Sequence, residues 1–452
     1  MKRIDKHVHF VGIGGIGMSA LALLLKQQGH RVSGSDMTDS HLLDSLRNAG
    51  ITITLGHSAE AVGDANLLVY SSAIKADNPE RHFAEEMGIQ EIRRAELLGE
   101  IAVGYTHTFA IAGTHGKTTT TGMCGQILVN AGQDPSILVG GILPNLGSNL
   151  RIGNRTNIVL EADEYDRSFL ALSPDRILIT TLEADHLDIY RDMQDIEATF
   201  QEFISKLDTS GILVIAGDDP VLDKLAATSN LQAVRYGQSV DNEYQATELR
   251  LDTFRSLFTV RRDGVSLGTI QLQMPGEHNV LNALGACALM DKSGIEFAAI
   301  KAGLEDFQGV ERRFQKRGER NGVIFIDDYA HHPSEIAATL AAARSGWPQA
   351  RIVAVFQPHL YSRTRDFAED FALALEKADT AIVTDIYPAR EAPIAGVSSE
   401  LIADHSSSII LKSDLDEVEQ FLQAHLREND LLITLGAGDI WKLHNRLLRE
   451  EG

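Results

Sequence analysis

The sequence has 452 residues, of which 44% are hydrophobic and 23% are charged, so we expect a globular protein of about three domains. Its net charge of −22 argues against nucleic-acid partners, because such a protein repels phosphate. No apolar run is long enough to cross a membrane and no secretory signal is visible. Two distant cysteines, Cys124 and Cys287, predict no disulfide framework, and we therefore expect a cytoplasmic protein without membrane partners.

Short runs rich in valine and isoleucine alternate with longer helical patterns along most of the chain. The predicted strands include 7–13, 66–73, 106–113, 156–163, 176–182, 211–217, 323–329, 351–357, 380–386 and 430–438. This alternation predicts α/β domains with parallel sheets. It restarts twice after the N-terminal unit, which predicts three domains at 1–99, 100–308 and 309–452. Within the second, residues 232–275 alternate as strands and predict a β-hairpin insertion.

A first glycine-rich turn follows the strand at 7–13 and precedes a helical pattern. Its glycines are Gly12, Gly14, Gly15 and Gly17, in the spacing GxGxxG. They permit a tight turn and let a diphosphate rest on the helix N-terminus, with Asp36 at the end of the next strand placed for a ribose hydroxyl. A turn without ligand is the plainer alternative. The residues alone do not say which nucleotide binds, and a dinucleotide such as NAD is the default.

A second glycine-rich turn follows the strand at 106–113 and opens a helix. It departs from the common phosphate-loop pattern because Ile111 occupies the first glycine position. Gly116 lets backbone N–H groups surround phosphate oxygens, Lys117 supplies a charge for the β and γ phosphates, and the Thr118 hydroxyl is a ligand for Mg²⁺. We therefore predict ATP binding by Gly113, Thr114, His115, Gly116, Lys117, Thr118 and Thr119.

Acidic side chains follow two successive strands of the central domain. One group is Glu161, Asp163, Glu164 and Asp166, and the other is Glu183, Asp185, His186 and Asp188. Ligands of open α/β sheets gather at the carboxyl ends of strands, and Mg²⁺ prefers oxygen ligands. The two groups together predict a metal site at the phosphate loop, although any one carboxylate could be a solvated loop residue and His186 alone would be ambiguous.

With these motifs assembled, the chain resembles the Mur ligase family over nearly its whole length. The resemblance is carried by GIGGIGMSALA (12–22), VSGSD (32–36), GTHGKTTTT (113–121), EADEYDRSFL (161–170), LEADHLDIY (182–190), PGEHNVLNALGA (275–286), RRF (312–314), DDYAHHPSE (327–335) and FQPHLYSRTRD (356–366). It implies an N-terminal Rossmann-like domain for a UDP-sugar, a central P-loop ATPase α/β domain, and a C-terminal Rossmann-like α/β domain that closes with the amino acid.

The resemblance also implies the reaction. The lactyl carboxylate of UDP-N-acetylmuramate attacks the γ-phosphate of ATP, and the amine of L-alanine then displaces phosphate from the acyl phosphate. Positioning and charge neutralisation dominate such chemistry. The cofactors implied are ATP and Mg²⁺, and we expect a monomer or weak homodimer.

Roles for particular residues follow from the same resemblance. The first turn would hold the UDP diphosphate, with Asp36 and Ser71 or Ser72 near the nucleoside and Ser35 among the substrate-binding residues. Thr118, Glu161 and His186 would hold Mg²⁺, and Asn279, Asn282, Arg313 and Asp328 would face ATP. The catalytic set would be Lys117, Glu161, His186, Arg313 and His331, whereas Arg363 and Arg365 would meet the substrates or be exposed arginines at a helix start. Leu360 departs from the family pattern, in which arginine is common.

Other functions compete with this interpretation. The nearest is a Mur-type ligase that adds another amino acid or a peptide. An NAD-dependent dehydrogenase would give Lys117 no role, and a non-catalytic scaffold would not need Lys117, Thr118, Glu161 and His186 together.

Overall fold

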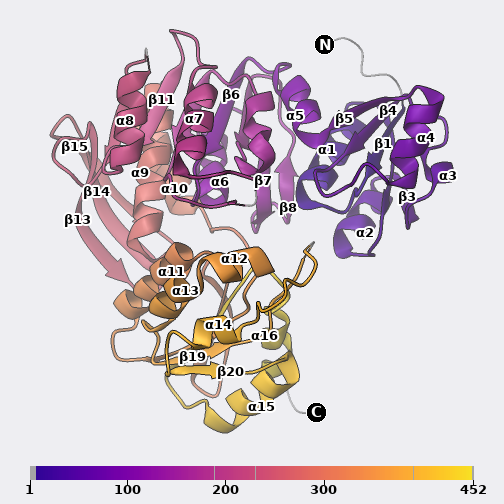
Figure 1. Ribbon diagram of the computed structural model, residues 1–452. Helices are drawn as coiled ribbons and strands as arrows, with labels where there is room; N and C mark the ends of the chain where they lie inside the picture. The colour runs from indigo at the N-terminus through magenta and orange to yellow at the C-terminus, as the bar shows by residue number, and fades with distance from the viewer. Residues whose placement is uncertain (1–6, 188, 230, 390, 450–452) are drawn as a thin grey trace. The chain divides into compact units, whose positions relative to one another are not determined.

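The computed structural model describes residues 7–187, 189–229, 231–389 and 391–449. Three sheets follow one another in chain order, from indigo to yellow in Figure 1. The chain divides into two compact units. The first runs to Gln245 and also takes in Val260–Leu267 and Asn282–Phe307; the second comprises Ala246–Thr259, Gly268–Leu281 and the chain from Gln308 onward.

The first sheet has five parallel strands in the order β3 (Thr52–Leu55), β2 (Arg31–Asp36), β1 (His7–Val11), β4 (Leu67–Tyr70) and β5 (Gln90–Arg93). The strand order reverses between β1 and β4, and ligands of such sheets bind at the carboxyl ends of the strands beside that reversal. The connecting helices are α1 (Ile16–Gln27), α2 (His41–Asn48), α3 (Ala59–Val62), α4 (Pro79–Met87) and α5 (Arg94–Ala102).

The second sheet has ten strands in the order β15-β14-β13-β12-β11-β10-β6-β9-β7-β8. Its parallel part is built from β6 (His107–Ala112), β7 (Ser136–Leu143), β9 (Asn157–Glu161), β10 (Arg176–Ile179), β11 (Ile212–Ala216) and β12 (Val234–Gly237). β8 (Ser148–Arg151) lies antiparallel to β7 at one edge. At the other edge lie β13 (Tyr244–Asp252), β14 (Arg255–Arg262) and β15 (Val265–Leu272). The sequence predicted a β-hairpin insertion over 232–275; instead, three strands extend the main sheet, and β12 belongs to its parallel part.

Helices complete the central region. They are α6 (Lys117–Asn130), the 3-10 helix η1 (Tyr165–Ala171), α7 (Met193–Ile204), α8 (Pro220–Thr228), α9 (Glu277–Lys292) and α10 (Phe297–Asp306). Helix α6 packs against α10 and β7, and its residues Met123, Cys124, Ile127 and Leu128 are buried. The α6 helix is therefore anchored on its apolar side, which fixes its N-terminus at the end of β6.

The first sheet and the second sheet are joined by a continuous core. Helix α1 contacts β7 and β8, and the Asn149 side-chain amide donates to the Ile16 carbonyl at 2.5 Å. Helix α5 packs on η1 so closely that a Cβ at Gly99 would collide with the Ala171 carbonyl. One buried cluster accordingly runs from Val8 through both sheets to Ala233. This shared core holds the first glycine turn in a fixed relation to the central sheet.

The second unit holds a six-stranded sheet in the order β16 (Gln315–Arg320), β17 (Val323–Asp328), β21 (Asp430–Leu435), β18 (Arg351–Phe356), β19 (Thr380–Val383) and β20 (Ile409–Leu411). β16 is antiparallel to β17 and the other pairs are parallel. Its helices are α11 (Pro333–Gly346), α12 (Tyr361–Asp366), α13 (Ala368–Leu375), α14 (Glu400–Ala403), α15 (Leu415–His425) and α16 (Lys442–Leu447). The predicted α/β class with three sheet-bearing regions is confirmed.

Candidate functional site

The first glycine turn joins β1 to α1 beside the strand-order reversal. Gly12 has a φ of +78°, a conformation that favours glycine. The backbone N–H of Gly14 donates to the Asp36 carboxylate at 2.8 Å, and the N–H of Thr38 donates to its other oxygen at 3.1 Å. A Cβ at Gly14 would lie within 2.8 Å of the same carboxylate. Asp36 therefore holds the turn itself, in addition to any contact with a ribose.

Ser71 and Ser35 lie in different surroundings. Ser71 follows β4, and its hydroxyl lies 3.8 Å from where a Cβ at Gly12 would be, so it faces the turn. Ser35 is fully buried; its hydroxyl donates to Glu80 at 2.8 Å and lies 3.0 Å from the His57 ring. The structure thus brings Ser71 to the predicted sugar-nucleotide turn and turns the Ser35 side chain into the domain interior.

The phosphate loop joins β6 to α6. Gly116 has a φ of +82°, and a Cβ there would collide with the side-chain amide of Asn282. Asn282 is buried at 8% exposure, so the structure brings this predicted ATP residue to the loop. Thr114 and His115 anchor the loop to the segment after β10, through Thr181 and Glu183. Thr119 is buried in the first turn of α6.

Lys117 is held between the loop and a buried carboxylate. Its ammonium donates to the carbonyls of Gly113 and Thr114 at 2.5 and 3.1 Å. It also forms an ion pair with Glu164 at 2.8 Å, and both side chains are largely buried. Burial raises the pKa of Glu164 to about 7, and the neighbouring carboxylates raise the pKa of Lys117 although its burial opposes them. Lys117 therefore stays charged at neutral pH, as phosphate binding requires.

Thr118 and Glu161 meet beside the loop, as the sequence predicted. The Thr118 hydroxyl donates to the Glu161 carboxylate at 3.2 Å, and the N–H of Gly140 donates to its other oxygen at 2.5 Å. Burial raises the pKa of Glu161. A hydroxyl and a desolvated carboxylate at a phosphate loop are hard oxygen donors, and they fit Mg²⁺.

His186 lies next to Glu164. Its Nε2 is 3.8 Å from Glu164 and 3.7 Å from Asp185, and its ring packs edge-on against Tyr165 at 5.0 Å. His186 has a φ of +55°, uncommon for a non-glycine residue and a feature of functional sites. Glu164, from the group after β9, and His186, from the group after β10, therefore lie next to each other. Asp188, predicted with this group, lies outside the described residues.

A chain of ion pairs runs from the phosphate loop to the first glycine turn. Glu164 pairs with Lys117, and the adjacent Asp163 lies 3.7 Å from the guanidinium of Arg94. A Cβ at Gly17 would collide with that guanidinium, so Arg94 lies directly against the turn. The two glycine-rich turns are thus the two ends of one charged path within the first unit.

In the second unit, Arg313, Asp328 and His331 surround one end of β17. Asp328 is buried and accepts from the N–H groups of Phe314 and Ala330 at 3.0 and 2.9 Å; burial raises its pKa to about 6. Glu335 lies 3.4 Å from Arg313 and 3.2 Å from the His331 ring. These three predicted residues are brought together by the start of α11.

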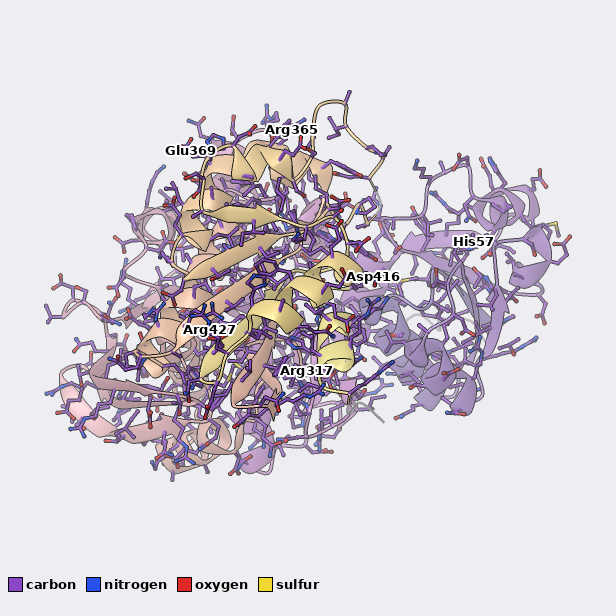
Figure 2. All side chains as sticks on the ribbon, turned by 90° about the horizontal axis from the view of Figure 1, so that it is seen from below. His57, Arg317, Arg365, Glu369, Asp416 and Arg427 are labelled. Carbon is purple, nitrogen blue, oxygen red and sulfur yellow. The ribbon has the colours of Figure 1, made fainter. Side chains whose placement is uncertain are left out.

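The other predicted residues of the second unit differ in exposure. Asn279 is buried and donates to the Pro275 carbonyl at 2.7 Å. Arg363 is buried at 6% exposure, which excludes the interpretation of an exposed arginine at a helix start. Arg365 is exposed and pairs with Asp366 at 2.7 Å. Figure 2 labels it near Glu369, which belongs to the next helix, α13. Leu360, at the N-terminal end of α12, is buried with a φ of +72°.

Sequence reasoning missed Arg93 and Arg94, and it gave Glu164 no separate role. Arg93 ends β5 and Arg94 opens α5, so both stand at the carboxyl edge of the first sheet. Arg93 is the N-cap of α5 and Arg94 is its first residue, so both oppose the helix dipole, which favours acidic residues there. This unfavourable charge at the start of a helix was the available signal. The partner of Lys117 had no comparable signal because four carboxylates stand close together in EADEYD.

Two nucleotide-type glycine turns on neighbouring sheets, one followed by a phosphate-loop lysine, are typical of nucleotide-binding enzymes. Family models match along the chain: "Mur ligase family, catalytic domain" at 7–106, "Mur ligase middle domain" at 111–290 and "Mur ligase, glutamate ligase domain" at 312–438. The chain belongs to the Mur ligase family and is an ATP-dependent ligase.

Individual relatives agree along the whole chain. It is 45% identical to a UDP-N-acetylmuramate–L-alanine ligase of Geobacter sp. (strain M21), covering 98% of this chain and 97% of the relative. A ligase of the same name from Trichlorobacter lovleyi is 43% identical over 98% of both. The solved UDP-N-acetylmuramate-alanine ligase of Thermotoga maritima matches with a TM-score of 0.84 at 31% identity over 98% of both chains. A murein peptide ligase of Psychrobacter arcticus matches with a TM-score of 0.74 at 26% identity, also over 98% of both.

Proposed function

We propose that this enzyme joins L-alanine to the lactyl carboxylate of UDP-N-acetylmuramate through an acyl phosphate, in peptidoglycan precursor synthesis. ATP is converted to ADP and phosphate in the process. The full-length identity of 43–45% to ligases named for this reaction supports the proposal. So does the T. maritima alanine ligase, which matches over the whole chain.

The observation that carries the mechanism is the charged path between the two glycine turns. A sugar nucleotide with its diphosphate on the Gly12–Gly17 turn would extend along Arg94 and Asp163 toward Glu164 and Lys117. Its carboxylate would then meet the γ-phosphate that Lys117 holds. Both reactants are anions, so bringing them together in a fixed orientation accounts for much of the rate.

We assign Mg²⁺ to Thr118 and Glu161, with His186 beside Glu164 as the candidate for a second ion. Bound there, Mg²⁺ would neutralise negative charge on the phosphates. Lys117 would do the same from its own position, which Glu164 fixes at 2.8 Å. Asn282 would approach the nucleotide from α9, where it already lies against Gly116.

We propose that the second unit brings the remaining groups to the reaction. Asn279, Arg313 and Asp328 would contact ATP; His331, Arg363 and Arg365 would contact the amino acid or the muramyl group. The buried Arg363 is a stronger candidate than Arg365, whose guanidinium is exposed and pairs with its neighbour Asp366. The proposed domains are 1–99 for the UDP-sugar, 100–308 for ATP and 309–452 for ligation.

Several expectations concern the setting of the enzyme. Among the described helices, none is long and apolar enough to cross a membrane. We expect the protein to act in the cytoplasm as a monomer or weak homodimer, without nucleic-acid or membrane partners. Sedimentation of the full-length protein would measure the oligomeric state.

The test is substrate-dependent phosphate release. The full-length enzyme with ATP, Mg²⁺ and UDP-N-acetylmuramate should release phosphate only when L-alanine is added. Mass spectrometry should detect the alanyl product. Release that does not require both the sugar nucleotide and an amino acid would refute the ligase proposal.

A second function is suggested by two of the solved structures. Besides the murein peptide ligase of P. arcticus, a Neisseria meningitides ligase that joins UDP-N-acetylmuramate to L-alanyl-γ-D-glutamyl-meso-diaminopimelate matches with a TM-score of 0.63 at 27% identity. The same assay with this tripeptide in place of L-alanine separates the two. Faster phosphate release with the tripeptide would favour peptide ligation.

A further inference from the structure

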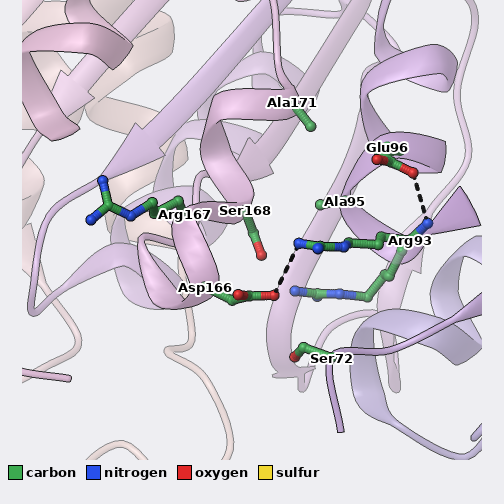
Figure 3. A pocket seen from close by; sticks show the side chains of 9 residues that line it. Ser72, Arg93, Ala95, Glu96, Asp166, Arg167, Ser168 and Ala171 are labelled. Carbon is green, nitrogen blue, oxygen red and sulfur yellow. Dashed lines mark hydrogen bonds and ion pairs between the residues drawn. The ribbon is translucent and has the colours of Figure 1, made fainter. Parts of the chain in front are cut away.

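A pocket of about 110 Å³ opens between the end of β4, the start of α5 and η1. Its lining includes Ser72, Arg93, Arg94, Asp166 and Ser168 (Figure 3). In the close-up, Arg93 points toward Asp166, while the guanidinium of Arg167 points away. The pocket lies at the carboxyl edge of the first sheet, the edge that also bears the first glycine turn.

Positive charge converges on this pocket from several sources. The guanidinium of Arg94 packs against Gly17, in the first turn of α1, where the helix dipole is positive. Arg94 itself opens α5, and Arg93 precedes it, so the N-terminal end of a second helix adds to the field. This concentration of positive charge suits a bound anion.

The counter-ions of these arginines are loosely placed. Arg93 lies 3.6 Å from Asp166, and Arg94 lies 3.7 Å from Asp163, with all four side chains partly exposed. Such pairs contribute little to stability. By contrast, Arg167 is bound by both oxygens of Asp195 at 2.8 and 2.9 Å and by Thr199 at 2.8 Å. Arg167 is thus committed to the fold, whereas Arg93, which also hydrogen-bonds with Tyr70, and Arg94 are held less tightly and can turn to a ligand.

The segment opposite the arginines has an unusual backbone. Asp166 and Arg167 both have a φ of +53°, and two successive non-glycine residues in this region carry strain. The strain turns Asp166 toward Arg93 and Arg167 toward Asp195.

We propose that Arg93 and Arg94 hold the diphosphate of the sugar nucleotide, with Arg94 clamping it against Gly17. The inference rests on the proposed function and names two residues for its sugar-nucleotide site. Guanidinium groups match phosphate oxygens through paired hydrogen bonds, which a turn of glycine N–H groups alone does not supply. Asp163 and Asp166 keep the two guanidinium groups oriented until the diphosphate takes their place.

The test is calorimetric binding of UDP and of ADP to full-length variants. Arg94→Ala should weaken UDP binding by about 10–100-fold, the effect of losing charged hydrogen bonds, and Arg93→Ala should weaken it less. Arg94→Lys should restore part of the loss. ADP binding at the phosphate loop should be unchanged in each variant, which shows that the protein is folded.

The matched control is Arg31→Ala, which removes an exposed arginine of the same domain, paired with Asp64 outside the pocket. It should bind UDP like the wild type. Equal UDP affinity for the wild type and Arg94→Ala would overturn this inference alone. Wild-type protein that binds neither UDP nor UDP-N-acetylmuramate would overturn the proposed function as well.

Discussion

The two glycine-rich turns look alike in outline but obtain their positive charge differently. Both join a central parallel strand to a helix, and both use glycines with positive φ, Gly12 in one and Gly116 in the other. The phosphate loop carries its own cation, Lys117, directly after its last glycine. The first turn has no cation of its own, and Arg94 reaches it from α5, far along the chain. The glycine motif therefore identifies a complete site at the phosphate loop. At the first turn it identifies only the backbone part of the site and not the cation.

Removing the cation within the loop should produce the largest effect. Lys117→Ala should lower kcat by about 10²–10³-fold, because an aligned charge in a water-poor site is lost. UDP-N-acetylmuramate binding should persist, since Arg94 serves the other turn. Phosphate release measures the rate, and calorimetry measures the affinity. A parallel loss of sugar-nucleotide affinity would indicate that the two turns are not separable.

The carboxylate beside the loop should matter next. Glu161→Gln keeps the shape but removes the charge offered to Mg²⁺, so the Mg²⁺ concentration for half-maximal rate should rise by about 10-fold or more. Titration of phosphate release with free Mg²⁺ measures this. The KM for UDP-N-acetylmuramate should change little. An unaltered Mg²⁺ requirement would contradict the assignment of Glu161.

A pair of glycine substitutions tests the first turn without touching an arginine. A Cβ at Gly17 would displace the Arg94 guanidinium, whereas a Cβ at Gly15 would meet only ordinary contacts, the nearest at 3.6 Å. Gly17→Ala should therefore raise the KM for UDP-N-acetylmuramate by about 3–10-fold, as expected when a charged contact is weakened rather than lost. Gly15→Ala should raise it less. The reverse order would mean that Arg94 does not serve this turn.

The smallest effect concerns pH, and it also distinguishes the turns. Burial raises the pKa of Glu164, at the phosphate loop, to about 7 from 4.5. Burial acts the same way on Glu80, below the first turn, but hydrogen bonds with His9 and Ser35 more than offset it and lower its pKa. Between pH 4.5 and 7 the folded state keeps a proton on Glu164 that the unfolded state has lost. The stabilisation contributed by Glu164 is therefore fully present below pH 4.5. It is lost as pH rises from 4.5 through 7.

Glu164→Gln should remove that component of the slope, at most about 1.4 kcal/mol per pH unit. Urea unfolding between pH 5 and 7 measures it. A slope that survives in Glu164→Gln would assign the effect to another group.

The sequence predicted most of the fold because the strands are short, apolar and regularly spaced. It located both turns, since glycine spacing at a strand end is a local property. It also placed Thr118 with Glu161, because both follow neighbouring strands. Ser35 was less informative: successive strand residues face opposite sides, so Ser35 and Asp36 cannot both face the turn.

The remaining site residues depend on tertiary placement. The pairing of Lys117 with Glu164 depends on how η1 turns after β9. The approach of Arg94 to Gly17 depends on α5 packing beside α1, which no local pattern encodes. An arginine at the start of a helix, where its charge opposes the helix dipole, is the sequence feature that can point to such residues.

The continuous core between the first two sheets limits how this enzyme can be rearranged. Helix α1 contacts both β7 and β8, and the Asn149 amide caps the Ile16 carbonyl. A fragment that ends near residue 99 would expose the side of α1 that normally lies against β7 and β8 and would lose this hydrogen bond. Grafting the sugar-nucleotide module onto another ligase would therefore require transplanting β7 and β8 along with it, because the two glycine-rich turns rest on one shared hydrophobic core.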